Sequence, residues 1–218
     1  MHESAASPQT EARTEAAQRV LEASKILFAE RGYDGVSIRD IAEKAKVSKA
    51  NVFHHFGSKA NLYAAILEQV AEQLGTKLDV LRDSSCSVQE RVARFAELDL
   101  QDQLEDPHCV YLFLRQLMAP NNTEQRRKAE QVIRDSLRSL LQLLEQLQEQ
   151  GELPADTDPL ALTLAIAGGN FMYFQLQGIL AEFQRDGRPV DPSTFSRSLM
   201  HLITPAVNNG PTPPTTRG

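Results

Sequence analysis

Residues 37–59 constrain the fold more than any other stretch, because they contain two short helical patterns only a few residues apart. Ser37 is a favoured N-cap residue, and Asp40 three positions later completes a capping-box pattern. Apolar residues then recur at helical spacing, and Ser48 marks the start of a second short helix that ends at Gly57. Two short helices joined by a tight turn predict a helix-turn-helix unit.

The second short helix carries a surface that suits DNA on the face opposite Val52 and Phe56. This outward face holds a cation, two imidazoles, an amide, an aromatic ring and a small residue, and it has no carboxylate. Major-groove recognition needs hydrogen-bond donors and no negative charge facing the DNA. A solvated helix that happens to lack acids is the alternative. The outward residues are Lys49, Ala50, Asn51, Phe53, His54 and His55.

The same region resembles the signature of the TetR (tetracycline-repressor) family of transcriptional regulators over residues 15–68. The matching segments are residues 32–42, 47–48 and 52–59. The chain departs from the family pattern at Lys46, where Gly is usual, and at Phe53 and His54, where Tyr is common. If Lys46 takes the left-handed conformation of the turn, it costs about 1–2 kcal/mol relative to Gly.

The resemblance and the helix face together give candidates for contact with DNA. Lys49, Asn51 and His55 are base-edge candidates, with Lys49 suited to guanine and Asn51 to adenine. Ala50 is small enough for close approach or for contact with a thymine methyl group. Arg39 is placed by the resemblance to contact a base or a phosphate. The candidates for the DNA backbone are Ser37, Ser48, Phe53, His54 and Lys59.

The formal net charge of −6 at first argues against nucleic-acid binding, but the charge is unevenly distributed. Residues 12–60 carry nine Lys and Arg against six Asp and Glu, a net charge of +3, whereas residues 61–218 carry −7. A mildly basic head suits a small number of phosphate contacts rather than a polycationic coat.

No stretch alternates like a strand over a sufficient length, so the predicted fold is all-α with about nine helices. The first helix is expected over residues 15–31, with Lys25 near the DNA backbone. The fourth is expected from Ser58 to about Leu74, as the rod that transmits changes between head and body. The predicted organisation is a disordered tail at 1–11, a helix-turn-helix DNA-binding domain at 12–60, a ligand-binding and dimerisation domain at 61–207, and a disordered tail at 208–218.

Residues 159–181 contain no charged side chain and are long enough to span a bilayer. Their flanks are Asp158 and Glu182 rather than the Lys or Arg expected beside a membrane. We therefore expect no membrane span but a buried helix, with one side on its own core and the other on a second subunit. With the last helix, from Pro192, it forms the expected homodimer interface, which in TetR-like proteins is an intersubunit four-helix bundle.

Motifs for catalysis or metal binding are absent from the sequence. The two cysteines, Cys86 and Cys109, are unclustered, and no apolar run opens the chain, so we expect a cytoplasmic protein with reduced thiols. The neighbouring His108 and Cys109 do not face one another on a helix. We expect no enzyme, no cofactor and no metal site; an enzymatic role would need a buried polar cluster around His108.

The resulting hypothesis is a dimeric, ligand-responsive transcriptional regulator, a repressor that binds a palindromic double-stranded DNA operator and is released by a small apolar or aromatic effector. The alternative is a helical ligand- or partner-binding module that does not read DNA. Candidates for the ligand pocket are aromatic and apolar residues of the body, each of which is also compatible with ordinary core packing. They are Phe95, His108, Tyr111, Phe113, Met118, Phe171, Tyr173 and Phe174.

Overall fold

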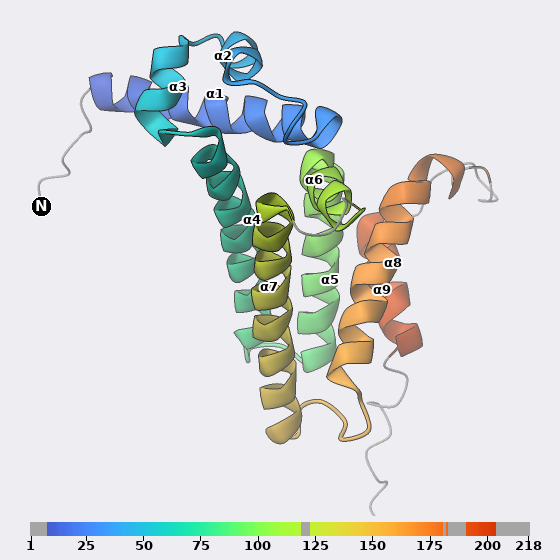
Figure 1. The fold of residues 1–218 in the computed structure, drawn as a ribbon. Coiled ribbons are helices and arrows are strands. Elements are labelled where there is room, and N and C mark those ends of the chain that lie inside the picture. The colour runs from blue at the N-terminus through green and yellow to red at the C-terminus, as the bar shows by residue number, and fades with distance from the viewer. Residues whose placement is uncertain (1–7, 119–122, 181, 183–190, 204–218) are drawn as a thin grey trace, which may run out of the picture. The chain divides into compact units, whose positions relative to one another are not determined.

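The computed structural model describes residues 8–118, 123–180, 182 and 191–203, and within these ranges the chain forms nine α-helices and no strand (Figure 1). The all-α fold predicted from the sequence is confirmed. The helices are α1 Pro8–Arg31, α2 Ile38–Ala45, α3 Lys49–Phe56, α4 Lys59–Arg82, α5 Val88–Glu105, α6 Pro107–Met118, α7 Glu124–Glu149, α8 Pro159–Leu180 and α9 Pro192–Ile203.

Two helices are longer than the sequence predicted. α1 begins at Pro8, so residues 8–11 are helical and do not belong to a disordered tail. Proline is tolerated in the first turn because its missing N–H would have no partner there. α4 continues to Arg82, since one glycine inside a helix costs only about 1 kcal/mol and the added turns bury Leu78 and Leu81. The other parts of the expected tails, residues 1–7 and 208–218, lie outside the described residues.

The chain divides into two compact units, which are described separately. Unit 1 comprises Met1–Gln73 and Asp106–Arg134, and unit 2 comprises Leu74–Glu105 and Asp135–Gly218. α4 and α7 each run from one unit into the other. The sequence also predicts a division by function, with a DNA-binding domain to residue 60 and a body from residue 61. The two compact units do not test this division, which stays a prediction.

Unit 1 has one apolar core, to which helices far apart in sequence contribute. Val20 of α1, Ile41 of α2 and Val52 of α3 are almost completely buried in it. Leu112 of α6 and Ala129 of α7 belong to the same cluster. The apolar spacing read from residues 15–68 therefore supplies most of this core, while α6 and α7 close it.

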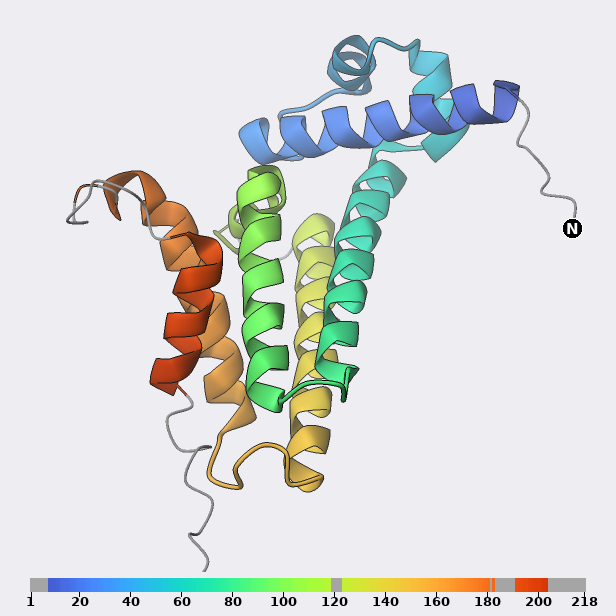
Figure 2. The same ribbon diagram turned by 180° about the vertical axis from the view of Figure 1, so that it is seen from behind.

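Unit 2 places α5, α8 and α9 side by side (Figures 1 and 2). Its core combines Leu81 of α4, Phe95 of α5, Leu144 of α7, Ile166 of α8 and Met200 of α9. These residues recur three or four positions apart with other apolar residues along each helix, as expected for helices that bury one face.

α8 and α9 pack closely because of a glycine. A Cβ atom added at Gly169 would lie only 2.7 Å from Cδ2 of Leu199 on α9, and a side chain there would push that residue aside. A Cβ atom added at the neighbouring Gly168 would meet no atom within 4 Å. Of the Gly168-Gly169 pair, one glycine thus serves packing within the unit and the other lies on the exposed side of α8.

α8 is covered on one side only. Leu162, Ile166 and Phe174 are buried, whereas Leu164 and Met172 on the opposite face stay more than half exposed. Among the described residues, no helix is both long and apolar enough to cross a membrane.

Candidate nucleic-acid interface

The turn that opens the helix-turn-helix is fixed by hydrogen bonds between Ser37 and Asp40. The Ser37 hydroxyl accepts from the Asp40 backbone N–H at 3.2 Å, and the Asp40 carboxylate accepts from the Ser37 N–H at 2.8 Å. This reciprocal pair is the capping box predicted from the sequence. The hydrogen bonds from Ser37 lower the pKa of Asp40, because they stabilise its charged form. The Asp40 carboxylate is therefore charged and lies at the start of α2, where it accepts hydrogen bonds from Ser37.

α2 ends in a left-handed residue. Lys46 has φ 56° and ψ 45°, and it is the only non-glycine residue with positive φ in the described part of the chain. Its N–H closes the helix by donating to carbonyl oxygens of the last turn, at Ala42 and Glu43. The left-handed conformation considered for Lys46 from the family pattern is confirmed, and the tight turn is kept without the usual glycine.

α3 presents most of the predicted reading surface outward. The Ser48 hydroxyl caps the helix by accepting from the Asn51 N–H at 3.1 Å, and Gly57 ends it with φ 72°. Val52 is 1% exposed and faces the core of unit 1. The exposed residues on and beside the helix are Ser48, Lys49, Ala50, Phe53 and His54. Ser37 and Arg39, beside and on α2, are exposed as well.

Two of the three base-edge candidates are partly covered. Asn51 and His55 are half-buried, because they follow each other four positions apart beside the inward stripe of α3. The Oδ1 atom of Asn51 is buried and accepts no hydrogen bond from the described residues. Pairing with adenine through both ends of the amide therefore requires the Asn51 side chain to turn outward. Lys49 is the base-edge candidate that already extends into solvent.

Lys59 is held against an aromatic ring at the start of α4. Its Nζ atom lies 4.1 Å from the centroid of the Tyr33 ring, a cation–π contact. Partial burial lowers the pKa of Lys59, since the charged form loses hydration. The Tyr33 ring in turn lies edge-on to Tyr63, at 5.4 Å between centroids. Sequence reasoning missed Tyr33 as a support for Lys59, because 26 positions separate the two residues.

Lys25, which the sequence suggested for the DNA backbone, is buried and paired with carboxylates in the structure. It is 8% exposed and pairs with Glu22 at 2.6 Å and with Asp106 at the start of α6. The Cys109 thiol donates to Asp106 Oδ2 at 3.3 Å. The sequence around Lys25 gives no sign of its partner Asp106, which is 81 positions away.

The polar cluster around His108 has no activated nucleophile. Nδ1 of His108 lies 3.7 Å from Asp106 Oδ1, and Asp106 is paired with Lys25. Burial, together with the charge of Asp106, raises the pKa of Cys109 to about 12. The thiol is therefore protonated near neutral pH, where a nucleophilic role would need a thiolate. Among the described residues, no group of three or more His, Cys, Asp or Glu residues is placed to hold a metal ion.

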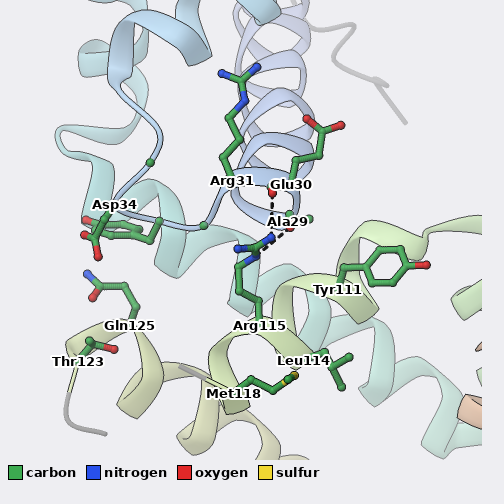
Figure 3. A pocket seen from close by; sticks show the side chains of 13 residues that line it. Ala29, Glu30, Arg31, Asp34, Tyr111, Leu114, Arg115, Met118, Thr123 and Gln125 are labelled. Atoms are coloured by element: carbon green, nitrogen blue, oxygen red, sulfur yellow. Dashed lines mark hydrogen bonds between the residues drawn. The ribbon is translucent and has the colours of Figure 1, made fainter. Parts of the chain in front are cut away.

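The pocket drawn in Figure 3 is an open hollow of about 800 Å³ in unit 1, beside the end of α1. Tyr111, Leu114 and Met118 contribute its apolar side chains. Arg115 crosses from α6 to α1, where its guanidinium donates to the carbonyl oxygens of Ala29 and Glu30 (Figure 3). Arg115, which lines the pocket, is thus already hydrogen-bonded to the end of α1.

The eight residues proposed for a ligand pocket are distributed over both units. In unit 1, Tyr111 and Met118 line the open hollow, Phe113 packs against the core, and His108 belongs to the polar cluster. In unit 2, Phe95, Tyr173 and Phe174 are buried and Phe171 is partly buried. Aromatic composition does not distinguish a core residue from a ligand contact, so the role of these eight residues in ligand binding stays a prediction.

The fold and this surface together define an all-helical protein with an N-terminal helix-turn-helix. Residues 20–66 match the model of the family described as bacterial regulatory proteins, tetR family. The HTH-type transcriptional repressor Rv3405c of Mycobacterium tuberculosis is 49% identical over 72 residues, which are 33% of this chain and 36% of that protein. The N-terminal region is thus similar to the tetR family, and the match to this curated relative spans about a third of that protein's length.

Solved structures resemble the chain over most of its length. The transcriptional regulator FadR from Bacillus subtilis, in complex with stearoyl-CoA, has a TM-score of 0.64 at 18% identity and covers 86% of this chain and 97% of its own. AibR, in complex with isovaleryl coenzyme A and operator DNA, has a TM-score of 0.64 at 19% identity and covers 87% and 98%. At these identities the likeness shows a shared fold.

Proposed function

We propose that the chain is a homodimeric transcriptional repressor that binds a palindromic DNA operator through α3 and is released by a small effector bound in unit 2. The observation that carries the proposal is the outward surface of α3. Lys49, Ala50, Phe53 and His54 are exposed there, no acid is present on the helix, and Val52 anchors it to the core. The repressor named among the relatives supports the direction of control.

The proposed DNA contacts are made by residues on and beside α2 and α3. Lys49 and Arg39 extend into solvent and are placed for a base edge or a phosphate. The capped starts of α2 and α3, at Ser37 and Ser48, offer backbone N–H groups to phosphates. His55 and Asn51 contribute to base recognition once their partly buried side chains turn toward the groove.

A second copy of the chain is the proposed occupant of the exposed face of α8. Four large apolar residues on this helix stay about half exposed: Leu160, Leu164, Met172 and Ile179. Exposed apolar surface of this kind is unusual on a monomer and marks an interface. A two-fold axis lets the same patch pair with itself, and α9 adds the exposed Leu202. A dimer then presents two α3 helices to half-sites about one or more turns of 34–36 Å apart.

The effector is proposed to bind among the helices of unit 2. Phe95, Phe171, Tyr173 and Phe174 supply apolar and aromatic surface on α5 and α8. Two proteins of the same fold were solved with acyl-CoA ligands, which supports a helical body that accepts a small molecule. Binding releases the operator if the ligand favours a state in which α4 sets the two heads at an unsuitable separation.

A salt titration of binding to duplex DNA tests the proposal. The wild-type affinity should fall steeply with salt, because each phosphate contact releases counterions. Lys49→Ala and Lys59→Ala should each reduce the slope of log K against log salt by about 0.9 if the residue contacts one phosphate. Lys128→Ala is the matched control, since this lysine lies on α7 and pairs with Glu124; its slope should equal that of the wild type.

A wild-type protein without a salt-dependent affinity for duplex DNA would contradict the proposal and favour a helical module that does not read DNA. Equal slopes for the wild type and both head variants would remove Lys49 and Lys59 from the contact set. Selection of duplexes from a random pool then gives the operator, whose two-fold symmetry tests the dimer.

A further inference from the structure

A partly buried polar network lies among the helices of unit 2. The Lys77 ammonium on α4 lies 3.0 Å from Asp99 Oδ1 and 3.1 Å from Asp102 Oδ2, both on α5. Nε2 of Gln103 and Nδ2 of Asn170 both donate to the other oxygen of Asp99, at 2.9 and 3.0 Å. One carboxylate thus connects α4, α5 and α8.

Two oxygen atoms in this network are buried and have no hydrogen-bond partner among the described residues: Asn170 Oδ1 and Gln103 Oε1. Asn170 has no exposed surface at all. Its amide cannot simply be reversed, because Nδ2 already donates to the Ala96 carbonyl oxygen at 2.9 Å as well as to Asp99. Buried acceptors in proteins are normally matched by a donor from the protein, a water or a ligand. Each of the two amide oxygens is therefore available to accept a further hydrogen bond.

The charge of the network disfavours an anion. Lys77 contributes one positive charge and Asp99 and Asp102 two negative charges, so the formal sum is −1. Burial alone would lower the pKa of Lys77, but the attraction and hydrogen bonds of Asp99 and Asp102 outweigh it and raise the pKa. Lys77 therefore stays charged and engaged with its two carboxylates, and no unpaired cation is present in the network to receive an acid.

Apolar side chains lie beside the network. Tyr173 and Phe174 follow Asn170 by three and four positions on α8, so all three share its buried face. Phe95 precedes Asp99 by four positions on α5 and is buried as well. A ligand that reaches Asn170 and Gln103 therefore has these aromatic side chains as neighbours for the rest of its surface.

We propose that Asn170 and Gln103 receive the polar head of the effector, and that this head is a hydrogen-bond donor, a hydroxyl or an ammonium group, on an apolar or aromatic body. The inference rests on the proposed ligand-binding function of unit 2 and names the chemical class of its ligand. It separates this chain from neighbours of the same fold that hold acyl-CoA, an anionic ligand.

Four probes with one skeleton test the head group: 2-phenylethanol, 2-phenylethylammonium, phenylacetate and ethylbenzene. Binding to the whole 218-residue chain is measured by saturation-transfer NMR with titration to saturation. We expect the alcohol or the ammonium ion to bind at least about tenfold more tightly than phenylacetate and ethylbenzene. A preference for the alcohol identifies a hydroxyl head, and a preference for the ammonium ion identifies a cationic one.

Substitutions assign the preference to the network. Gln103→Met and Asn170→Leu remove the two unmatched oxygens and should each weaken the favoured probe by at least about tenfold. Gln101→Met is the matched control, because Gln101 lies on the same helix with an exposed side chain and should leave the affinity unchanged. Asp102→Asn makes the formal charge of the network zero, and it should weaken the ammonium probe while sparing the alcohol. If Asn170→Leu does not fold, Gln103→Met decides the question.

Three binding results would overturn the inference: phenylacetate binding as tightly as the donor probes, a favoured probe whose affinity is unchanged in Gln103→Met, or no saturable binding of any donor probe. Ordered waters on both oxygens that no donor probe displaces in a crystal structure would do the same. The DNA salt slope is measured on the same preparations. A wild-type slope together with any of these outcomes contradicts the head-group inference alone, whereas loss of the slope contradicts the repressor function.

Discussion

Arg115 Nε on α6 donates a hydrogen bond to the Ala29 carbonyl oxygen in the last turn of α1, at 3.1 Å. Its Nη2 donates to the next carbonyl oxygen, at Glu30, at 2.8 Å. The last carbonyl groups of a helix have no intrahelical donor, so a side chain from another element can satisfy them. Because Lys25 pairs with Asp106 at the other end of α6, that helix is fastened to α1 at both ends.

Replacing Arg115 by Met keeps much of the apolar side chain and removes both donors. We expect Arg115→Met to reduce the free energy of unfolding by about 1–2 kcal/mol, since two charge-assisted hydrogen bonds are lost at a partly exposed site. Urea denaturation followed by circular dichroism measures the change. Arg138→Met, which removes only an exposed pair with Asp135, should change the stability by less than about 0.5 kcal/mol. Equal losses in the two variants would show that Arg115 does not stabilise α1.

The Lys25–Asp106 pair predicts a stability that depends on pH. Burial alone would raise the pKa of Asp106, but hydrogen bonds from Lys25 and Cys109 and the charge of Lys25 hold it below its ordinary value of 3.8. A carboxyl group with a depressed pKa in the folded state stabilises the protein above its unfolded pKa, and this contribution is lost as the pH falls through the folded value. Asp106→Asn should therefore be less stable than the wild type at pH 7 and approach it at acidic pH.

The expected difference at pH 7 is about 2 kcal/mol, below the value for a fully buried pair because the Asp106 side chain is 28% exposed. Urea denaturation between pH 7 and pH 3 measures it. Asp79→Asn serves as the control, since Asp79 pairs with Arg82 on the surface and should contribute little at any pH. A difference between the wild type and Asp106→Asn that stays constant to pH 3 would contradict the assignment.

Lys46 offers a stabilising substitution in the turn of the helix-turn-helix. With φ 56°, it occupies a conformation that glycine adopts without the clash of a Cβ atom. We expect Lys46→Gly to raise the free energy of unfolding by about 1 kcal/mol, the relieved clash being partly offset by the greater freedom of unfolded glycine. Lys44→Gly, inside α2, should lower it by about 1 kcal/mol. Thermal unfolding with opposite signs for the two variants supports this reading; a loss at both positions opposes it.

The exposed stripe of α8 predicts an assembly defect. Leu164 is 58% exposed, and a charge introduced there would be buried without a partner in the proposed homodimer. Leu164→Glu should therefore raise the dimer dissociation constant by at least about tenfold while leaving helix content unchanged. Sedimentation equilibrium measures the change, with Ala155→Glu, in the loop before α8, as the control. Dimers as tight in Leu164→Glu as in the wild type would place the interface elsewhere.

Much of the candidate site could be read from the sequence because its geometry is local. The bonds that cap α2 and α3 join residues three positions apart, Ser37 to Asp40 and Ser48 to Asn51. The inward position of Val52 follows from helical periodicity, and so does the outward position of Lys49. Asn51 and His55 are half-buried because of the elements that lie beside α3. The periodicity of a single helix does not predict those neighbours.

Local sequence alone was enough to predict that the chain is helical, how α2 and α3 are capped, and which face of α3 carries no acid, since each depends on residues within about four positions of one another. The distant partners of Lys25, Arg115 and Asn170, which lie 71 to 86 positions away in the chain, could be found only from the folded structure. These groups donate to carboxylates or carbonyl oxygens, which every stretch of the sequence contains in several copies. Packing of the apolar faces selects one of them by bringing it within hydrogen-bond distance.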